Sequence, residues 1–441
     1  MMNFINTLKD IFKIEELKNK ILLTIGLIAV YRFMASVPLP GIDPLQLSAL
    51  KESTSGGLFG LLNAFTGGAF ARASVMALGI MPYISASIVV QLMGIAVPYL
   101  QKLQKDGESG RKKITQITRW LTIGITLVQA PTYITAIKTQ FGLGPEAFLV
   151  PGLTFWISSI IILTAGTIFA MWLGERITDK GVGNGISLLI TVGIIANFPA
   201  AFLQEFLAKT TNAGAGGLMM VLIEIIVWFV VILLTVLLVT AVRKIAVQYA
   251  RRTVAGNIQN VAGSRDYIPL KLNAAGVMPI IFAQAIMFLP MALGQKFPAL
   301  IGLTDPFGWQ YNVIFALLII IFSFFYTAIT IPTNKMAEDL KRSGGFIPGI
   351  RPGKDTAEKL DSVLSRITFP GSLFLAALSI LPAVVVQFGV QQGWAMFYGG
   401  TSLIIMVGVA IDTMQQINSY LLNRHYDGLM KPGNSNRKSN K

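Results

Sequence analysis

Long apolar runs, separated by short polar and charged segments, dominate this chain of 441 residues. A helix needs about 20 mostly apolar residues to cross the hydrocarbon core of a bilayer. The last run, Ile367–Ile411, is uncharged and too long for one crossing, so we divide it at Gln387–Trp394, which is rich in glutamine and glycine. The pattern then predicts ten membrane-spanning helices, near residues 21–38, 74–98, 117–137, 153–174, 184–206, 219–240, 273–293, 312–333, 367–387 and 395–415.

A further uncharged stretch, Ser53–Ala71, is predicted not to cross the membrane. It contains five glycines, and its apolar centre, Leu58–Phe65, is short. Those eight residues would make only about two helical turns. We therefore expect a short re-entrant or plugging helix over about residues 57–68.

The distribution of basic residues supports this topology. With ten spans and a cytoplasmic N-terminus, 30 of the 36 lysines and arginines lie on the cytoplasmic side, five lie outside, and Arg32 lies within a span. Lysine and arginine concentrate in the cytoplasmic loops of membrane proteins. An eleventh span at Ser53–Ala71 would place most of the later basic loops outside. We expect a multi-pass membrane protein with both termini cytoplasmic, and the compact loops fit the cytoplasmic (inner) membrane of a bacterium.

Ten spans divide naturally into two halves of five. Because five is odd, the second half enters the membrane inverted relative to the first, which is a common arrangement in transport proteins. The predicted fold is an all-α polytopic membrane protein with two inverted five-helix halves and a short plug helix that does not span. The predicted parts are an N-terminal half (1–196), an external connector (197–217), a C-terminal half (218–424) and a cytosolic tail (425–441).

Two of the predicted cytosolic loops are large, about 243–271 and 334–366. In the second loop, two prolines and four glycines surround Arg351. These residues favour tight turns, which would present Arg351 at a tip. A solvated basic loop is the ordinary interpretation, but two such loops favour a docking surface for a cytosolic partner.

Composition narrows the chemistry. Hydrophobic residues make up 53% of the chain and charged residues only 13%, with a net charge of +15, which favours loops near anionic lipid. The chain has no cysteine, a single histidine (His425) and no phosphate-binding loop signature. We therefore expect no enzyme activity, metal or cofactor. Arg32, Glu224 and Asp412 are ionisable residues within predicted spans; they lie near span ends, where snorkelling or structural pairing is the simpler interpretation.

Several ordered strings resemble the SecY family, the central subunit of the protein-conducting channel. The region from Gly67 to Ile88 is similar to the start of that family's second span. Further similar strings, spread over nearly the whole chain, are Pro38–Asp43, Gly181–Ser187, Pro269–Asn273 and Phe346–Gly353.

The resemblance implies an hourglass channel between two five-helix halves, closed at its waist by apolar side chains. β-Branched side chains have few rotamers, and a narrow apolar constriction excludes water and ions. Such a lining can close around a polypeptide without binding it tightly. The implied ring residues are Ile80, Ile84, Ile186, Ile190, Ile281 and Ile405.

The resemblance also identifies the short helix as a plug, with glycines that suit hinges at its ends. The implied plug residues are Gly57, Leu58, Phe59, Leu61, Leu62, Asn63, Phe65, Gly67 and Gly68. In this family the channel opens sideways to lipid between spans two and seven. Gln91 and Asn273 are similar to the polar pair at that lateral gate.

The partners implied by the resemblance are the channel subunits SecE and SecG, the SecA motor ATPase, the ribosome, and the signal peptides and polypeptides in transit. The channel itself would be passive, with energy from a partner. The docking residues would be Arg351, Arg251, Arg252, Lys341 and Arg342. The sequence departs from the family at Thr253–Asp266, where the basic cluster expected at the loop tip is thin.

Two other classes of protein are compatible with a ten-span helical bundle. A secondary transporter for a small solute would need convergent polar groups near the midplane of the membrane, and the sequence offers none. A non-conducting membrane scaffold would need neither a plug nor glycine hinges.

Overall fold

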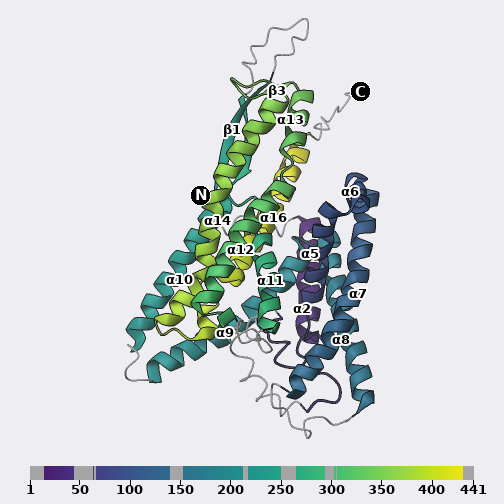
Figure 1. The fold of residues 1–441 in the computed structure, drawn as a ribbon, viewed down its shortest axis with the longest axis vertical. Helices are drawn as coiled ribbons and strands as arrows, with labels where there is room; N and C mark the ends of the chain where they lie inside the picture. The colour runs from purple at the N-terminus through teal and green to yellow at the C-terminus, as the bar shows by residue number, and fades with distance from the viewer. Residues whose placement is uncertain are drawn as a thin grey trace, which may run out of the picture. The chain divides into compact units, whose positions relative to one another are not determined.

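The computed structural model describes residues 14–43, 63, 66–139, 152–211, 217–249, 265–293, 302–303 and 305–430. Long helices account for most of these residues, with one small antiparallel sheet (Figure 1). The described residues form two compact units. The first holds those up to residue 197 and those after 408, and the second holds residues 198–408. The division at an external connector stays a prediction.

The first unit is built on helices that pack side by side, with α7 in contact with both α5 and α8, and α2 against α8. Buried threonines on α7 (Thr118, Thr122 and Thr126) each donate their hydroxyl to the backbone carbonyl four residues earlier. The helices are α2 (Glu15–Met34), α5 (Met81–Ala96), α6 (Pro98–Lys105), α7 (Gly107–Thr139), α8 (Leu153–Lys180) and the first half of α9 (Gly185–Thr211), with most of α16 (Gly400–Met430).

In the second unit, α12 packs against both α11 and α14. Exposed side chains on α10 such as Phe229 and Leu237 are apolar, as expected where a helix faces lipid. The second unit begins with the second half of α9. Its other helices are α10 (Gly217–Thr240), α11 (Met278–Leu293), α12 (Trp309–Thr330), α13 (Thr333–Arg342), α14 (Lys354–Gln387), α15 (Gln392–Ala395) and the start of α16.

The prediction of a helical polytopic membrane protein is confirmed. Within the described residues, seven helical segments are long and apolar enough to cross a membrane. The helices α5 and α6 form a further apolar pair, bent by 101° at the break between them. Two predicted spans remain. The span at 21–38 corresponds to α2, which is charged at both ends, and the span at 273–293 corresponds to α11, which has 16 residues. The exact number of ten therefore stays a prediction.

The sheet was not predicted, because its strands lie in the segments expected to be cytosolic loops. It contains β1 (Val242–Tyr249), β2 (Arg265–Lys271) and β3 (Gly345–Phe346), in the order β2-β1-β3 with antiparallel pairing. Pro269 is tolerated because β2 is an edge strand. Strand β1, α13, α14 and the turn between the two helices share one buried cluster, which contains Val247, Leu340, Ile347 and Leu360. The two large loops are thus joined into one folded structure with α13 and the start of α14 (Figure 1).

Candidate functional site

A compact non-helical segment leads from Asn63 into α5, and we call residues 66–80 the anchor segment. Most of it is buried, including Phe70, Ser74 and Ile80. Asn63 holds its start, because its carbonyl oxygen accepts from the Gly68 amide at 2.9 Å and its side-chain oxygen accepts from the Ala71 amide at 3.0 Å. Local hydrogen bonds therefore replace helical ones over this segment.

The anchor segment has an unusual backbone. Gly67, Gly68, Ala73 and Gly79 all have positive φ, at 66°, 85°, 44° and 53°. A left-handed conformation is strained for alanine, at a cost of about 1–2 kcal/mol. Such strain persists only where the surrounding structure over-determines it. The buried Ala73 is therefore held in its conformation by its neighbours.

The predicted plug lies only partly within the described residues. Asn63, Gly67 and Gly68 are described and belong to the first unit. The other proposed plug residues lie outside the described residues: Gly57, Leu58, Phe59, Leu61, Leu62 and Phe65. The structure shows a second reason for glycine at position 67, besides the freedom of a hinge. A Cβ atom there would overlap a guanidinium nitrogen of Arg32 and the Cα of Gly193.

Four of the proposed ring residues lie in the first unit, as two pairs each separated by four residues. Ile80 precedes α5 and is buried, and Ile84 lies on its first turn and is half-buried. On α9, Ile186 is half-buried and Ile190 is buried. Residues at i and i+4 share one face of a helix, so each pair presents two isoleucines on one side.

The other two proposed ring residues lie in the second unit. Ile281 on α11 is half-buried, and Ile405 on α16 is buried. All six are apolar and none is fully exposed, as a ring requires. Their closure into one constriction stays a prediction.

The proposed lateral-gate residues also lie one in each unit. The side-chain amide of Gln91, on α5, donates to the hydroxyl of Ser87 at 3.2 Å. Asn273 is buried just before α11. The pairing of these two residues stays a prediction.

Three of the proposed docking residues lie within the described residues, and all three are exposed. Lys341 and Arg342 end α13, and Arg351 lies in the turn between β3 and α14. The carbonyl oxygen of Arg351 accepts from the Thr356 hydroxyl at 2.8 Å, which fixes this turn. Arg251 and Arg252 lie outside the described residues.

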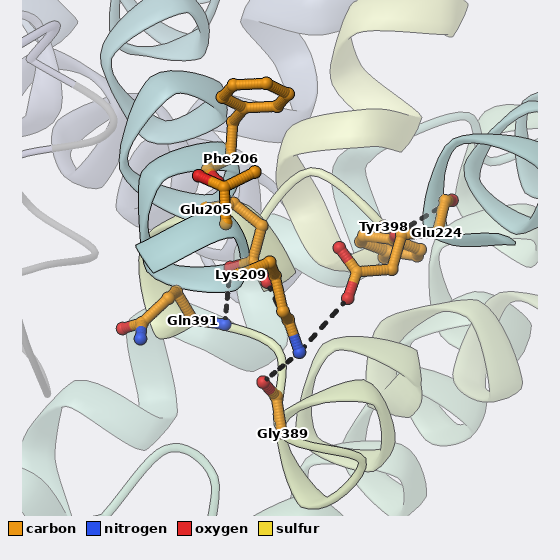
Figure 2. A network of polar contacts seen from close by, with 8 residues as sticks. Glu205, Phe206, Lys209, Glu224, Gly389, Gln391 and Tyr398 are labelled. Carbon is orange, nitrogen blue, oxygen red and sulfur yellow. Dashed lines mark hydrogen bonds and ion pairs between the residues drawn. The ribbon is translucent and has the colours of Figure 1, made fainter. Parts of the chain in front are cut away.

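A buried ionic network in the second unit was missed by sequence reasoning (Figure 2). Lys209, on α9, lies 3.7 Å from a carboxylate oxygen of Glu205 and 3.4 Å from one of Glu224, on α10. The ammonium group also donates to the Gly389 carbonyl at 2.8 Å, and Glu205 accepts from the Gln391 amide at 2.8 Å. The network thus ties α9 and α10 to the turn that follows α14.

Part of this network has a sequence signal. Glu224 stood out as an ionisable residue in a span, and its contact with Lys209 agrees with structural pairing. Glu205 and Lys209 have the spacing of a helical ion pair, which could have identified them. Their approach to Glu224 and to Gly389 depends on how α9, α10 and α14 pack, and no local pattern encodes it.

An aromatic cluster lies in the same unit and joins α9 and α10 to α15. Trp394, on α15, packs against rings from α9 and α10, and the Trp228 indole donates to the Phe397 carbonyl at 2.9 Å. The cluster contains Phe198, Phe202, Trp228, Trp394 and Phe397. The rings are therefore closely packed in this part of the second unit.

Within the part of the chain that the structure describes, no group of three or more histidine, cysteine, aspartate or glutamate residues could hold a metal ion.

The long apolar helices define a polytopic helical membrane protein, and its fold matches solved structures. A solved structure described as a protein-conducting channel matches with a TM-score of 0.63 and 19% identity over 94% of each chain. Sec61 in a canine ribosome-channel complex from the endoplasmic reticulum matches with a TM-score of 0.58 and 18% identity over 94% of each chain.

The family is shown by sequence comparison. The model of the SecY family matches residues 74–414. The protein translocase subunit SecY of Streptomyces scabiei is 39% identical over 436 residues, covering 95% of this chain and 98% of the relative. That of Aquifex aeolicus is 38% identical over 434 residues, covering 96% and 99%. The chain belongs to the SecY family, as its motifs predicted.

Proposed function

We propose that the chain is the channel subunit of a protein translocase, which passes unfolded secretory polypeptides across the cytoplasmic membrane. The observation that carries this proposal is the identity of about two residues in five, along nearly the whole length, with relatives named protein translocase subunit SecY. The fold shared with solved protein-conducting channels supports it.

The chemistry of the proposed pore suits this task. The six isoleucines offer no charge and no hydrogen bond, so a polypeptide of any sequence can pass without being trapped. Because water leaves a narrow apolar constriction, the ring would oppose ion flow at rest. The channel would be passive, and a partner ATPase or the ribosome would supply the energy.

Sideways release of apolar segments would use the lateral gate at Gln91 and Asn273. A polar contact between helices in lipid contributes only about 1 kcal/mol. An apolar signal segment can therefore replace it at little cost. The plug, over about residues 57–68, would close the external side until such a segment enters.

The sheet, α13 and the Arg351 turn would form the cytosolic docking surface. The expected partners are the ribosome and a SecA-type motor, with SecE and SecG as further channel subunits. The solved relative bound in a ribosome-channel complex supports a ribosome partner. The basic excess supports cytoplasmic termini in an inner membrane with anionic lipid.

Cysteine cross-linking tests this function, since the natural chain has no cysteine. Single-cysteine variants Ile84→Cys and Ile190→Cys would be reconstituted with an arrested secretory polypeptide that carries one cysteine. A disulfide adduct at both positions, absent from the exposed position Leu237→Cys on α10, would support a polypeptide in the pore. A stable, inserted protein without adducts would contradict the pore assignment and favour a transporter or a scaffold.

A further inference from the structure

Arg32, near the end of α2, is a charged residue in a predicted span with an unusual partner. Its guanidinium donates to the carbonyl oxygen of Gly67 at 3.1 Å. Among the described residues, the structure pairs no carboxylate with Arg32. A charge in a membrane span is costly and is a functional candidate by default. The hydrogen bond from Arg32 to Gly67 therefore joins α2 to the anchor segment.

Gly67 is fitted closely to this contact. It lies between Arg32 of α2 and Gly193 of α9, where no side chain has room. The neighbouring Asn197, also on α9, donates to the Asn63 carbonyl at 3.4 Å. The start of the anchor segment is thus held between α2 and α9.

A third helix holds the middle of the anchor segment. The buried hydroxyl of Tyr133, on α7, donates to the Phe70 carbonyl at 2.8 Å. Its ring also meets the Phe70 ring edge-on, with the centroids 4.8 Å apart. The Leu39 amide also donates to the Ala73 carbonyl at 2.8 Å. These contacts hold the chain at Ala73 and three residues before it.

From this arrangement we infer that Arg32 and Tyr133 are positioning residues, which latch the anchor segment in its strained conformation and so keep the channel closed. The inference rests on the proposed channel function. The carbonyl oxygens of Gly67 and Phe70 accept hydrogen bonds from side chains of two different helices. Strain in the segment favours its departure, and the latch opposes that departure. Release of the latch is then a step in opening.

Ion conductance of the resting channel tests the latch. Each variant would be purified with the chains that accompany it and reconstituted in planar bilayers without a polypeptide substrate. Arg32→Met removes the hydrogen bond that a charged donor makes to the Gly67 carbonyl, and it is expected to raise resting conductance roughly tenfold or more. Arg32→Lys keeps a donor and is expected to restore part of the closure. Arg119→Met, which removes the arginine paired with Glu175 in the same unit, is the matched control and should leave conductance unchanged.

Tyr133→Phe provides a second test that changes the shape of the core very little. Loss of one neutral hydrogen bond is expected to raise resting conductance roughly threefold. Tyr311→Phe removes a buried tyrosine hydroxyl from the second unit and should have no effect. If Arg32→Met does not fold, the comparison of Tyr133→Phe with Tyr311→Phe tests the inference by itself.

Two outcomes would overturn the latch. One is wild-type resting conductance in folded Arg32→Met and Tyr133→Phe channels. The other is an equal rise in the two control variants. Polypeptide transport by the wild-type protein is measured in the same vesicles. If it transports and the variants do not leak, only the latch fails, whereas a wild-type protein without transport would contradict the proposed function itself.

Discussion

The ammonium group of Lys209 lies 3.4 Å from a carboxylate oxygen of Glu224, and this ion pair joins α9 to α10 inside the second unit. Both side chains are at most 7% exposed. Removing one partner of a buried pair leaves an uncompensated charge and costs about 3–5 kcal/mol. Because Lys209 also faces Glu205, its loss leaves two carboxylates together.

We therefore expect Lys209→Met to lower the free energy of unfolding by about 3–5 kcal/mol, measured by unfolding in detergent. Lys112→Met is the matched control and should change stability little. Lys112 pairs with Glu108 four residues away, as Lys209 does with Glu205, but on an exposed surface. Adding Glu224→Gln to Lys209→Met should recover part of the loss. Equal effects of the two lysine substitutions would contradict the role of the network.

The aromatic cluster makes a separate prediction. Trp394 is 2% exposed and contacts rings from α9 and α10. Trp394→Ala should lower the free energy of unfolding by about 3–5 kcal/mol, because a large cavity is left. The control is Trp309→Ala, at a position 71% exposed. Similar unfolding midpoints for the two variants would show that the cluster does not stabilise this unit.

Two glycines with the same backbone angle separate conformational strain from steric overlap. Gly67 and Gly107 both have φ of 66°, but only Gly67 is enclosed, and nothing lies within 4 Å of a Cβ built at Gly107. Gly107→Ala should cost only about 1–2 kcal/mol of stability, from the left-handed conformation. Gly67→Ala should cost more and should raise resting conductance. A Gly67→Ala channel that stays closed and is no less stable than Gly107→Ala would argue against the close approach to Arg32.

The proposed ring predicts a leak when a polar group enters it. Ile190→Asn places an amide in an apolar constriction, where it can retain water. We expect ion leakage or relaxed selection of signal sequences, measured by bilayer conductance and by transport of a polypeptide with a defective signal. Ile190→Leu keeps the site apolar and should behave like the wild type. Unchanged conductance and selection in Ile190→Asn would remove Ile190 from the ring.

The exposed turn at Arg351 predicts an effect on binding without an effect on folding. Arg351→Glu reverses a charge on the proposed docking surface and should weaken ribosome binding by roughly tenfold or more. The unfolding midpoint should stay unchanged, since the side chain is exposed. Lys354→Glu, three residues later at the start of α14, should have a smaller effect. Equal losses would indicate general electrostatic attraction and not a specific contact.

Hydrophobic length predicted most of the helices well. The span expected at 219–240 is observed as Gly217–Thr240, and that at 184–206 as Gly185–Thr211. This succeeds because lipid offers no hydrogen bonds, so each apolar run must satisfy its backbone within its own helix. The same reasoning failed for the start of α14 at Lys354, since the first turns of that helix are charged and amphipathic.

By itself, the sequence determined the helical class, most of the spans and the family, because these depend on local composition and on ordered motifs. Tertiary structure alone decided the rest. The sheet pairs Gln248 with Phe346, and the latch joins Arg32 to Gly67. Lys209 finds Glu224 only once α9 and α10 pack together. Such contacts link residues far apart along the chain, and their geometry arises from the packing of whole helices, which no local pattern of residues contains.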